Sequence, residues 1–238
     1  MFGLFSKMDR ISTGTKVLDS VLNGGYESGV ISTIYGPAGS GKTTLCLLCI
    51  ANISNGKKII YVDTENGFSV ERLSQITESY KEILSRILFL RPNDFEEQKK
   101  CIKKLSGIIN DKIGIIIFDT IAMLYRLELK DMDIYQVNRE LGNQVSCLSR
   151  CAMEHKIPVI IINQVYSDFE DKTKTHIVGG DIVRYGSKCL IELQISQNNY
   201  RKFIVRKHRS IPEEKCVMFK IINNGIEEIK ESKGFKLF

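Results

Sequence analysis

A nine-residue glycine-rich stretch carries the clearest chemical signal in the sequence. It consists of Gly36, Pro37, Ala38, Gly39, Ser40, Gly41, Lys42, Thr43 and Thr44, between a β-branched apolar segment and an apolar helical segment. We call it the phosphate loop, because glycines at these spacings let successive backbone N–H groups point at phosphate oxygens where a helix begins. Lys42 can reach the β- and γ-phosphates, and the Thr43 hydroxyl can bind Mg²⁺. The stretch therefore predicts a site for ATP and Mg²⁺.

Three polar side chains follow apolar strands further along the chain. Glu65 comes after the predicted strand 59–63, Asp119 lies at the end of strand 113–120, and Gln164 ends strand 158–164. Parallel strands present their carboxyl ends at one edge of a sheet, so we expect these side chains beside the phosphate loop. Asp119 would hold the Mg²⁺ shell with Thr43. Glu65 is either a base for an attacking water or a helix-capping acid, and Gln164 either senses the γ-phosphate or hydrogen-bonds the sheet end.

The order of the segments predicts an α/β fold in one core domain over residues 1–238, with an N-terminal arm (1–10) and a loose tail (230–238). Strands alternate with helices up to residue 164, and hairpins follow. This order predicts a mostly parallel twisted sheet flanked by helices, with antiparallel strands at one edge. The finer expectations are a first helix capped by Ser12 or Thr13, one helix from 69 to about 84, an irregular segment 121–133, a loop 165–180, and hairpin strands 185–196 and 202–209.

Composition limits the class of protein. The seven cysteines are scattered, and Cys46-x-x-Cys49 lies on the predicted helix after the phosphate loop, where packing explains it better than metal binding. Such cysteine usage indicates a reducing, cytoplasmic compartment. The apolar runs are too short for a membrane span, which needs about 20 residues. The net charge is +6, and segment 184–209 carries seven cations against Glu192 alone. This basic stripe indicates either a polyanion partner or a solvated strand face.

An ordered set of motifs over roughly residues 11–229 resembles the RecA/RadA recombinase family. The set comprises Thr13-Gly14 with Asp19 and Gly24-Gly25, the phosphate loop, Tyr61-Val62-Asp63-Thr64-Glu65, Glu71-Arg72-Leu73, Ile117-Phe118-Asp119, Leu124-Tyr125-Arg126, Asn163-Gln164-Val165 and Gly179-Gly180-Asp181-Ile182. The resemblance implies a RecA-like ATPase core and a role in homologous recombination and DNA repair. It also implies that Glu65 is the water-activating base, Gln164 the γ-phosphate sensor and Arg72 an adenine-stacking residue.

Departures from the recombinase pattern refine this implication. About ten residues precede the core, so we expect neither an N-terminal helical domain nor a Phe-x-x-Ala docking segment. Segment 127–133 is acidic where recombinases have a Gly- and Arg-rich first DNA loop, and the second loop, 165–180, is close to neutral. These features resemble the short archaeal paralogues of the recombinases. That resemblance implies a mediator that binds ATP and single- or double-stranded DNA of any sequence, associates with a RadA-type recombinase, and has a weak DNA-independent ATPase without strand exchange.

Further candidate contacts lie in the basic stripe and the two loops. Lys207 and Arg209 form a Lys-x-Arg pattern that resembles KaiC, in which such residues reach a neighbouring subunit's phosphates, and this implies a homo-oligomer. The candidate DNA contacts are Arg126, Lys172, Lys174, Arg184, Arg201, Lys202 and Arg206. Two alternatives to a recombination mediator stay open: a KaiC-like regulatory ATPase that does not bind DNA, and an ATP-ordered, non-catalytic scaffold for a partner recombinase.

Overall fold

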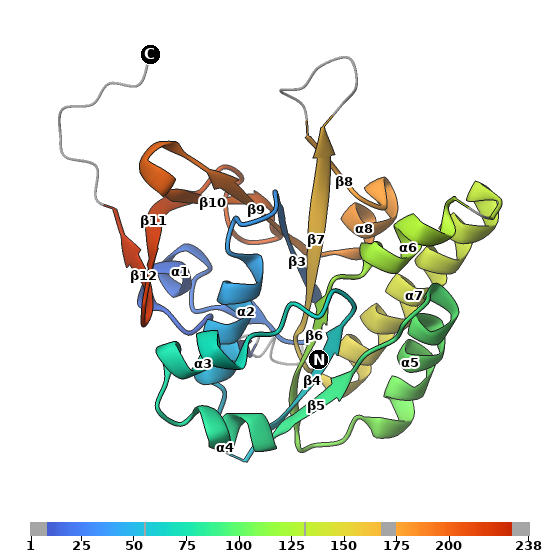
Figure 1. The fold of residues 1–238 in the computed structure, drawn as a ribbon, viewed down its shortest axis with the longest axis horizontal. Helices are drawn as coiled ribbons and strands as arrows, with labels where there is room; N and C mark the ends of the chain where they lie inside the picture. Colours follow the sequence, from blue (N-terminus) through green and yellow to red (C-terminus); the bar gives the residue numbers. More distant parts are fainter. Residues whose placement is uncertain (1–8, 55, 131, 168–174, 230–238) are drawn as a thin grey trace, which may run out of the picture.

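The computed structural model describes residues 9–54, 56–130, 132–167 and 175–229 (Figure 1). Its strands are β1 (Arg10–Ile11), β2 (Tyr26–Glu27), β3 (Ile31–Gly36), β4 (Lys58–Asp63), β5 (Ile87–Leu90), β6 (Ile113–Asp119), β7 (Val159–Ser167), β8 (Thr175–Ile177), β9 (Cys189–Ile195), β10 (Arg201–Lys207), β11 (Cys216–Ile222) and β12 (Gly225–Glu228). Its helices are α1 (Lys16–Val21), α2 (Lys42–Ala51), α3 (Val70–Ile76), α4 (Tyr80–Ser85), α5 (Phe95–Ile108), α6 (Ala122–Glu128), α7 (Ile134–His155) and α8 (Gly180–Gly186), with a 3₁₀ turn η1 (Gln197–Asn199).

One ten-stranded sheet runs through the centre. Nine strands lie in the order β12-β11-β10-β9-β3-β7-β6-β4-β5, and β8 pairs with β7 beside them. The neighbours from β9 to β5 pair in parallel, whereas β9 to β12 pair antiparallel at one edge. A mostly parallel sheet with an antiparallel edge is the predicted architecture, which is thereby confirmed.

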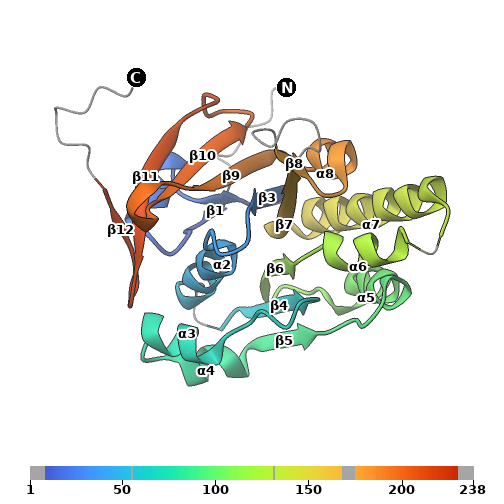
Figure 2. The ribbon, with the colours of Figure 1, turned by 45° about the horizontal axis from the view of Figure 1, so that its top comes forward.

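Helices cover both faces of the sheet (Figures 1 and 2). Helices α1 to α4 pack on one face and α5 to α8 on the other. In β6, Ile115 and Ile117 face the first helix layer, whereas Ile116 and Phe118 face the second, and all four are fully buried. A strand that is buried on both faces has to be apolar without alternation, as β6 is. The two cores hold the parallel strands so that their carboxyl ends share one edge.

The start of the chain differs from its prediction in how α1 is capped. Thr15 caps the helix, since its side chain accepts a hydrogen bond from the backbone N–H of Leu18. Ser12 and Thr13, the predicted caps, instead donate their hydroxyl groups to the carboxylate of Asp19, at 2.6 and 2.8 Å. Each hydroxyl accepts from a backbone N–H that precedes α1, Ser12 from Gly14 and Thr13 from Thr15, and not from an N–H of the helix.

Several boundaries also differ from the sequence prediction. The helix predicted over 69–84 is interrupted, because Thr77 is extended and ends α3. The segment 121–133 contains α6, and Tyr185 belongs to α8 instead of a strand. Strands β7 and β8 take up the ends of the predicted 165–180 loop. The arm residues 1–8, the tail 230–238, and Lys172 and Lys174 lie outside the described residues.

Two simple expectations can be checked against the described part of the chain. Cys46 and Cys49 are buried on α2, as their predicted packing role requires. Among residues 9–54, 56–130, 132–167 and 175–229, no helix combines the length and the apolar character that crossing a membrane requires.

Candidate nucleotide-binding site

The phosphate loop connects the end of β3 to the start of α2, as predicted. Gly41 has φ +100° and immediately precedes α2, a conformation that favours glycine. A Cβ at Gly36 would lie 2.3 Å from the carbonyl oxygen of Leu193, and one at Gly41 would lie 2.8 Å from Cδ1 of Ile221. Gly36 is therefore needed because the loop passes directly against the backbone of β9, and Gly41 is favoured by its backbone conformation.

Lys42 lies inside its own loop. Its Nζ donates to the carbonyl oxygens of Gly36 and Pro37 at 2.9 and 2.8 Å, and the residue is 8% exposed. Burial lowers the pKa of Lys42, while the negative charges of Asp119 and Glu65 oppose this shift. The structure thus brings both predicted acids into the electrostatic environment of the lysine.

Asp119 connects β6 to the start of α2. Its Oδ2 accepts hydrogen bonds from the Thr43 hydroxyl and the Tyr61 hydroxyl, both at 2.8 Å. Burial raises the pKa of Asp119, the two hydrogen bonds act in the opposite direction, and the nearby Asp63 and Glu65 raise it further. A hydroxyl and a carboxylate in contact provide the oxygen ligands that Mg²⁺ prefers. Tyr61 belongs to a motif of the resemblance, but we predicted no role for its hydroxyl.

The donor set fits Mg²⁺ bound together with a nucleotide. No group of three or more His, Cys, Asp or Glu side chains within the described ranges could hold a metal ion by itself. Magnesium commonly takes one or two protein oxygens and completes its shell with phosphates and water. The Ser40 hydroxyl is buried and has no hydrogen-bond partner in the described part of the chain, so the phosphate loop also holds a spare donor.

Glu65, just after β4, meets Gln164, which pairs with Gly36 at the end of β3; β7 continues to Ser167, so Gln164 does not end its strand as predicted. The Gln164 side-chain Nε2 donates to Oε1 of Glu65 at 2.8 Å, and the Thr120 hydroxyl donates to the same oxygen at 2.9 Å. Thr64 ties the strand ends together, because its hydroxyl donates to the carbonyl oxygen of Thr120 and accepts from the N–H of Thr120. The predicted proximity is therefore observed, and the roles in catalysis stay predictions. Thr120 was not predicted, since nothing in its sequence context distinguishes its hydroxyl.

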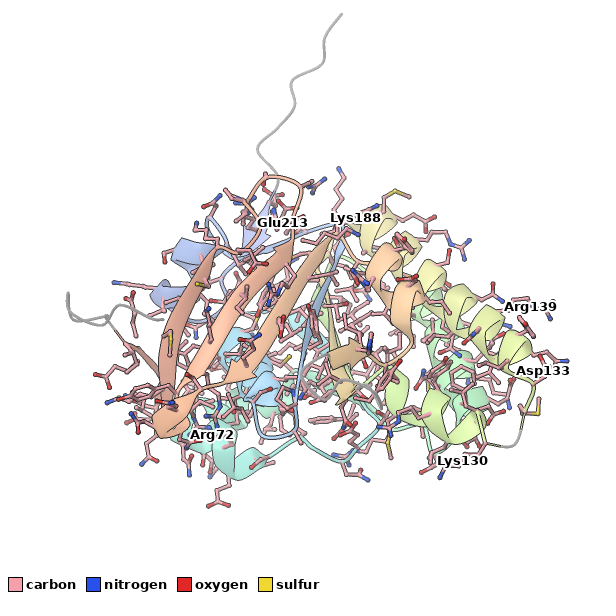
Figure 3. All side chains as sticks on the ribbon, turned by 90° about the horizontal axis from the view of Figure 1, so that it is seen from above. Arg72, Lys130, Asp133, Arg139, Lys188 and Glu213 are labelled. Carbon is pink, nitrogen blue, oxygen red and sulfur yellow. The ribbon has the colours of Figure 1, made fainter. Side chains whose placement is uncertain are left out.

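Arg72 joins α3 to the turn between β11 and β12. Its guanidinium donates to the carbonyl oxygens of Ile222 and Asn223, each at 2.7 Å. Seen from above, Arg72 lies beside the end of the antiparallel edge of the sheet (Figure 3). Ile221, next to this turn, contacts the phosphate loop at Gly41. Arg72 therefore lies near the phosphate loop, on the side where the β11–β12 turn approaches it. Its contact with adenine stays a prediction.

The comparisons with known proteins agree with this geometry. Residues 5–229 match the family model described as Rad51. The chain belongs to the Rad51 family. Proteins named "DNA repair and recombination protein RadB" are 36% identical over 230 residues in Methanobrevibacter smithii and 40% identical over 216 residues in Methanocaldococcus jannaschii. The alignments cover 93% and 90% of this chain and 97% and 100% of those relatives.

A solved structure supports the same assignment within the Rad51 family. The "Crystal structure of the RadB recombinase" aligns with a TM-score of 0.79 and 36% identity, over 92% of this chain and all of that one. A further RadB relative, from Methanococcoides burtonii, is 39% identical over 221 residues, which are 92% of this chain and 97% of the relative. These findings confirm the RecA-like fold and the predicted resemblance to a recombinase paralogue.

Within this Rad51-family chain, much of the basic stripe has internal partners. Arg206 is paired with Glu192 at 2.6 Å and also with Glu214. Arg201 is 8% exposed, which is not the accessible position that its predicted DNA contact requires. Lys202 is half-buried, whereas Arg126 and Arg184 are exposed as a DNA contact requires. The net charge of the segment therefore overstates the number of cations that are available to bind DNA, because acids of the antiparallel edge pair with some of them.

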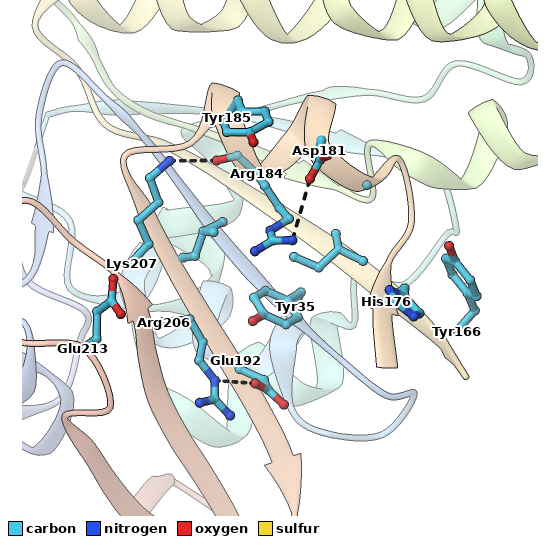
Figure 4. Close-up of a pocket in the computed structure, with 13 residues that line it drawn as sticks. Tyr35, Tyr166, His176, Asp181, Arg184, Tyr185, Glu192, Arg206, Lys207 and Glu213 are labelled. Atoms are coloured by element: carbon cyan, nitrogen blue, oxygen red, sulfur yellow. Dashed lines mark hydrogen bonds and ion pairs between the residues drawn. The ribbon is translucent and has the colours of Figure 1, made fainter. Parts of the chain in front are cut away.

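The predicted pair Lys207 and Arg209 is separated. A cavity of about 700 Å³ beside α8 is lined by Lys207 and Arg184 together with Tyr35 and other residues (Figure 4). Burial and the positive charge of its neighbours, Lys188 first and then Arg184, lower the pKa of Lys207. Arg209 does not line this cavity, because its guanidinium forms a two-pronged ion pair with the buried carboxylate of Glu27 at 2.7 and 2.8 Å. Lys207 alone of the two lines the cavity.

Proposed function

We propose that this chain binds ATP and Mg²⁺ at the phosphate loop, binds DNA, and acts in homologous recombination and repair as a paralogue that regulates a RadA-type recombinase. The observation that carries the nucleotide site is the set of contacts around the loop: Thr43 with Asp119, and Glu65 with Gln164. The role in recombination is supported by the Rad51 family match and by relatives named for DNA repair and recombination.

Each side chain has a defined task in this proposal. Lys42 exchanges its two carbonyl partners for phosphate oxygens, and its charge stabilises the negative charge that develops during phosphoryl transfer. Thr43 and Asp119 hold the Mg²⁺, which supplies charge neutralisation when bound. Glu65 orients and deprotonates the attacking water, and Gln164 responds to the γ-phosphate.

The contacts of Glu65 support slow hydrolysis. Two donors, from Gln164 and Thr120, occupy the same carboxylate oxygen, Oε1. A base that already accepts two hydrogen bonds has to release one, or receive the water at its other oxygen. Gln164 lies on β7, and this strand leads into the predicted second DNA loop. A change in the Gln164–Glu65 hydrogen bond when the γ-phosphate binds would therefore be passed along β7 to that loop.

The tip between α6 and α7 supports a mediator over a recombinase. Leu127, Met132, Ile134 and Tyr135 are large apolar side chains with 45–81% of their surface exposed. In Figure 3, Lys130 and Asp133 mark this tip, which lies on the opposite side of the molecule from Arg72. Apolar and acidic groups contact phosphates poorly. We therefore assign the first loop no DNA contact beyond Arg126. The cavity that contains Lys207 supports a homo-oligomer, in which this lysine would meet an anion of a neighbouring copy.

Fluorescence titration with single- and double-stranded DNA at several salt concentrations tests the DNA function. For the wild type, log Kd should depend linearly on log salt concentration, with about 0.7 units of slope per phosphate contact on a single strand and about 0.9 on duplex. Exchanging Arg126 and Arg184 together for Ala should reduce the slope by the amount expected for one or two phosphate contacts. The matched control is Lys81→Ala on α4, a surface cation that belongs to no predicted site and should leave the slope unchanged.

Absence of wild-type binding to either DNA would favour the regulatory ATPase that does not bind DNA. If the wild type binds and the double variant keeps its affinity and slope, the DNA contacts lie elsewhere. ATP turnover that Glu65→Gln does not remove, or no turnover at all, would favour the non-catalytic scaffold.

A further inference from the structure

Arg201, at the start of β10, contacts the tip of the phosphate loop. Its Nη2 donates to the carbonyl oxygen of Gly39 at 3.0 Å, across 162 residues of sequence. Its Nη1 donates to the backbone oxygen and to the side-chain Oδ1 of Asn199, at 2.5 and 2.8 Å. One guanidinium group thus bonds both the tip of the phosphate loop and the turn that precedes its own strand.

The loop tip has little other support at this point. A Cβ placed on Gly39 would meet no atom within 4 Å, and its φ of +71° shows a backbone held in the left-handed region. The hydrogen bond from Arg201 therefore acts where side-chain packing does not constrain the loop. A bond from a charged donor to a carbonyl is among the stronger protein hydrogen bonds.

The charge of Arg201 is not neutralised by an acid. Arg206 and Arg209 of the same basic stripe each pair with a carboxylate, whereas Arg201 forms no ion pair with any acid in the described ranges. It is 8% exposed, and its Nε is buried without a hydrogen-bond partner among the residues that the structure describes. A buried cation without a counter-charge is costly, and a nearby anion reduces that cost. The phosphate loop is where the proposed function places such an anion.

We propose that Arg201 is a positioning residue for nucleotide binding, which fixes the tip of the phosphate loop and adds an uncompensated positive charge behind it. The inference deepens the proposed ATP-binding function and rests on it. It makes the antiparallel edge of the sheet part of the nucleotide site, because Ile221 on β11 also contacts the loop at Gly41. It also makes the exposed turn η1 relevant to nucleotide affinity, since Asn199 sets the direction of the guanidinium group.

Two measurements on Arg201→Gln test this role. Hydrogen–deuterium exchange of the nucleotide-free protein should be faster in a peptide covering residues 36–44 than in the wild type. Titration with a fluorescent ATP analogue and Mg²⁺ should show affinity at least about tenfold weaker, as expected for loss of a charged hydrogen bond.

Arg86→Gln is the matched control. The Arg86 guanidinium likewise donates to two backbone carbonyls, of Ser54 and Lys57, although unlike Arg201 it also pairs with an acid, Glu82, at 3.7 Å. It lies just before β5, at the other end of the sheet from β10. This variant should keep both the loop exchange and the nucleotide affinity of the wild type.

Wild-type loop exchange and wild-type affinity in Arg201→Gln would overturn the inference, as would an equal loss in Arg86→Gln, which would indicate general destabilisation. If circular dichroism shows that Arg201→Gln does not fold, Arg201→Lys decides. It keeps the charge but has no fork of donors, so it should show faster loop exchange with a smaller loss of affinity. A wild type that does not bind the ATP analogue would contradict the proposed function, whereas the loop exchange would still test Arg201.

Discussion

Glu65 is the residue whose exchange separates nucleotide binding from hydrolysis. Its carboxylate accepts hydrogen bonds from Gln164 and Thr120, and no hydrogen bond ties it to the phosphate loop. Gln at this position retains the size and one acceptor oxygen but cannot take a proton from water. Glu65→Gln should therefore lower the single-turnover rate of ATP hydrolysis by about 10²–10⁴-fold while ATP affinity stays within a few-fold.

The control for this experiment is Glu71→Gln, on the exposed first turn of α3. It should hydrolyse ATP like the wild type. Hydrolysis at the wild-type rate in Glu65→Gln would assign the base to another group and return Glu65 to the role of a structural acid.

Asp119 should reduce the stability of the nucleotide-free protein at neutral pH. Burial raises its folded-state pKa, so the native protein binds a proton more readily than the unfolded chain does. Stability is then lost as the pH rises from about 4, the usual Asp pKa, through the raised pKa. Asp119→Asn removes this loss and should raise the melting temperature at pH 7.5 by about 2–4 °C for each kcal/mol recovered.

The measurement is the difference in melting temperature between Asp119→Asn and the wild type as a function of pH, without nucleotide or Mg²⁺. The difference should grow from pH 4 upward and level off above the raised pKa. A wild type that melts above the variant at pH 7.5 would contradict the assigned direction of the pKa shift.

At the scale of elements, the strands that end at the site were predictable because burial on both faces makes them continuously apolar, as in β6. The polar residues that follow them then point to one sheet edge, so the contacts of Asp119 and Glu65 could be anticipated. Helix α6 could not be predicted, because Ile121 offers no side-chain cap and the helix begins shortly after strand β6. Helix α8 was missed because it begins at Gly180, directly after Gly179, and two consecutive glycines usually indicate a turn. The contacts of Arg201 depend on sheet order, which residue patterns do not encode.

The short α1 unit depends on one carboxylate. Asp19 accepts hydrogen bonds from the Ser12 hydroxyl and from the N–H and hydroxyl of Thr13, at 2.6–2.8 Å. Asp19→Ala leaves these donors without their partner, so we expect it to lower the free energy of unfolding by about 1–3 kcal/mol. The loss should be visible in urea denaturation, while ATP affinity stays unchanged because no hydrogen bond among the described residues links the Asp19 cluster to the phosphate loop.

Glu78→Ala, in the exposed connection between α3 and α4, is the control and should be close to neutral. Equal denaturation midpoints for Asp19→Ala and Glu78→Ala would show that the hydrogen-bonded cluster around Asp19 adds nothing to stability.

At the scale of the whole molecule, charge and fold are coupled through the antiparallel edge of the sheet. The net charge of +6 arises largely in the segment that forms this edge, yet Glu27, Glu192 and Glu214 neutralise several of its cations from within. Two other cations of this segment face functional candidates: Arg201 lies behind the phosphate loop, and Lys207 lines the cavity beside α8, where Arg184 pairs with Asp181. A basic segment in the sequence is therefore only partly a basic surface in the fold.

The central claim is that the carboxyl ends of β3, β4, β6 and β7 form one site for a triphosphate with its magnesium. Calorimetric titration of ATP into the full chain, with Mg²⁺ and with a chelator, tests it most directly. We predict clear binding that Mg²⁺ strengthens, loss of the Mg²⁺ effect in Asp119→Asn, and at least about 100-fold weaker binding in Lys42→Ala, with Lys57→Ala unchanged. Lys42→Ala binding ATP like the wild type, or an affinity indifferent to Mg²⁺, would contradict the claim.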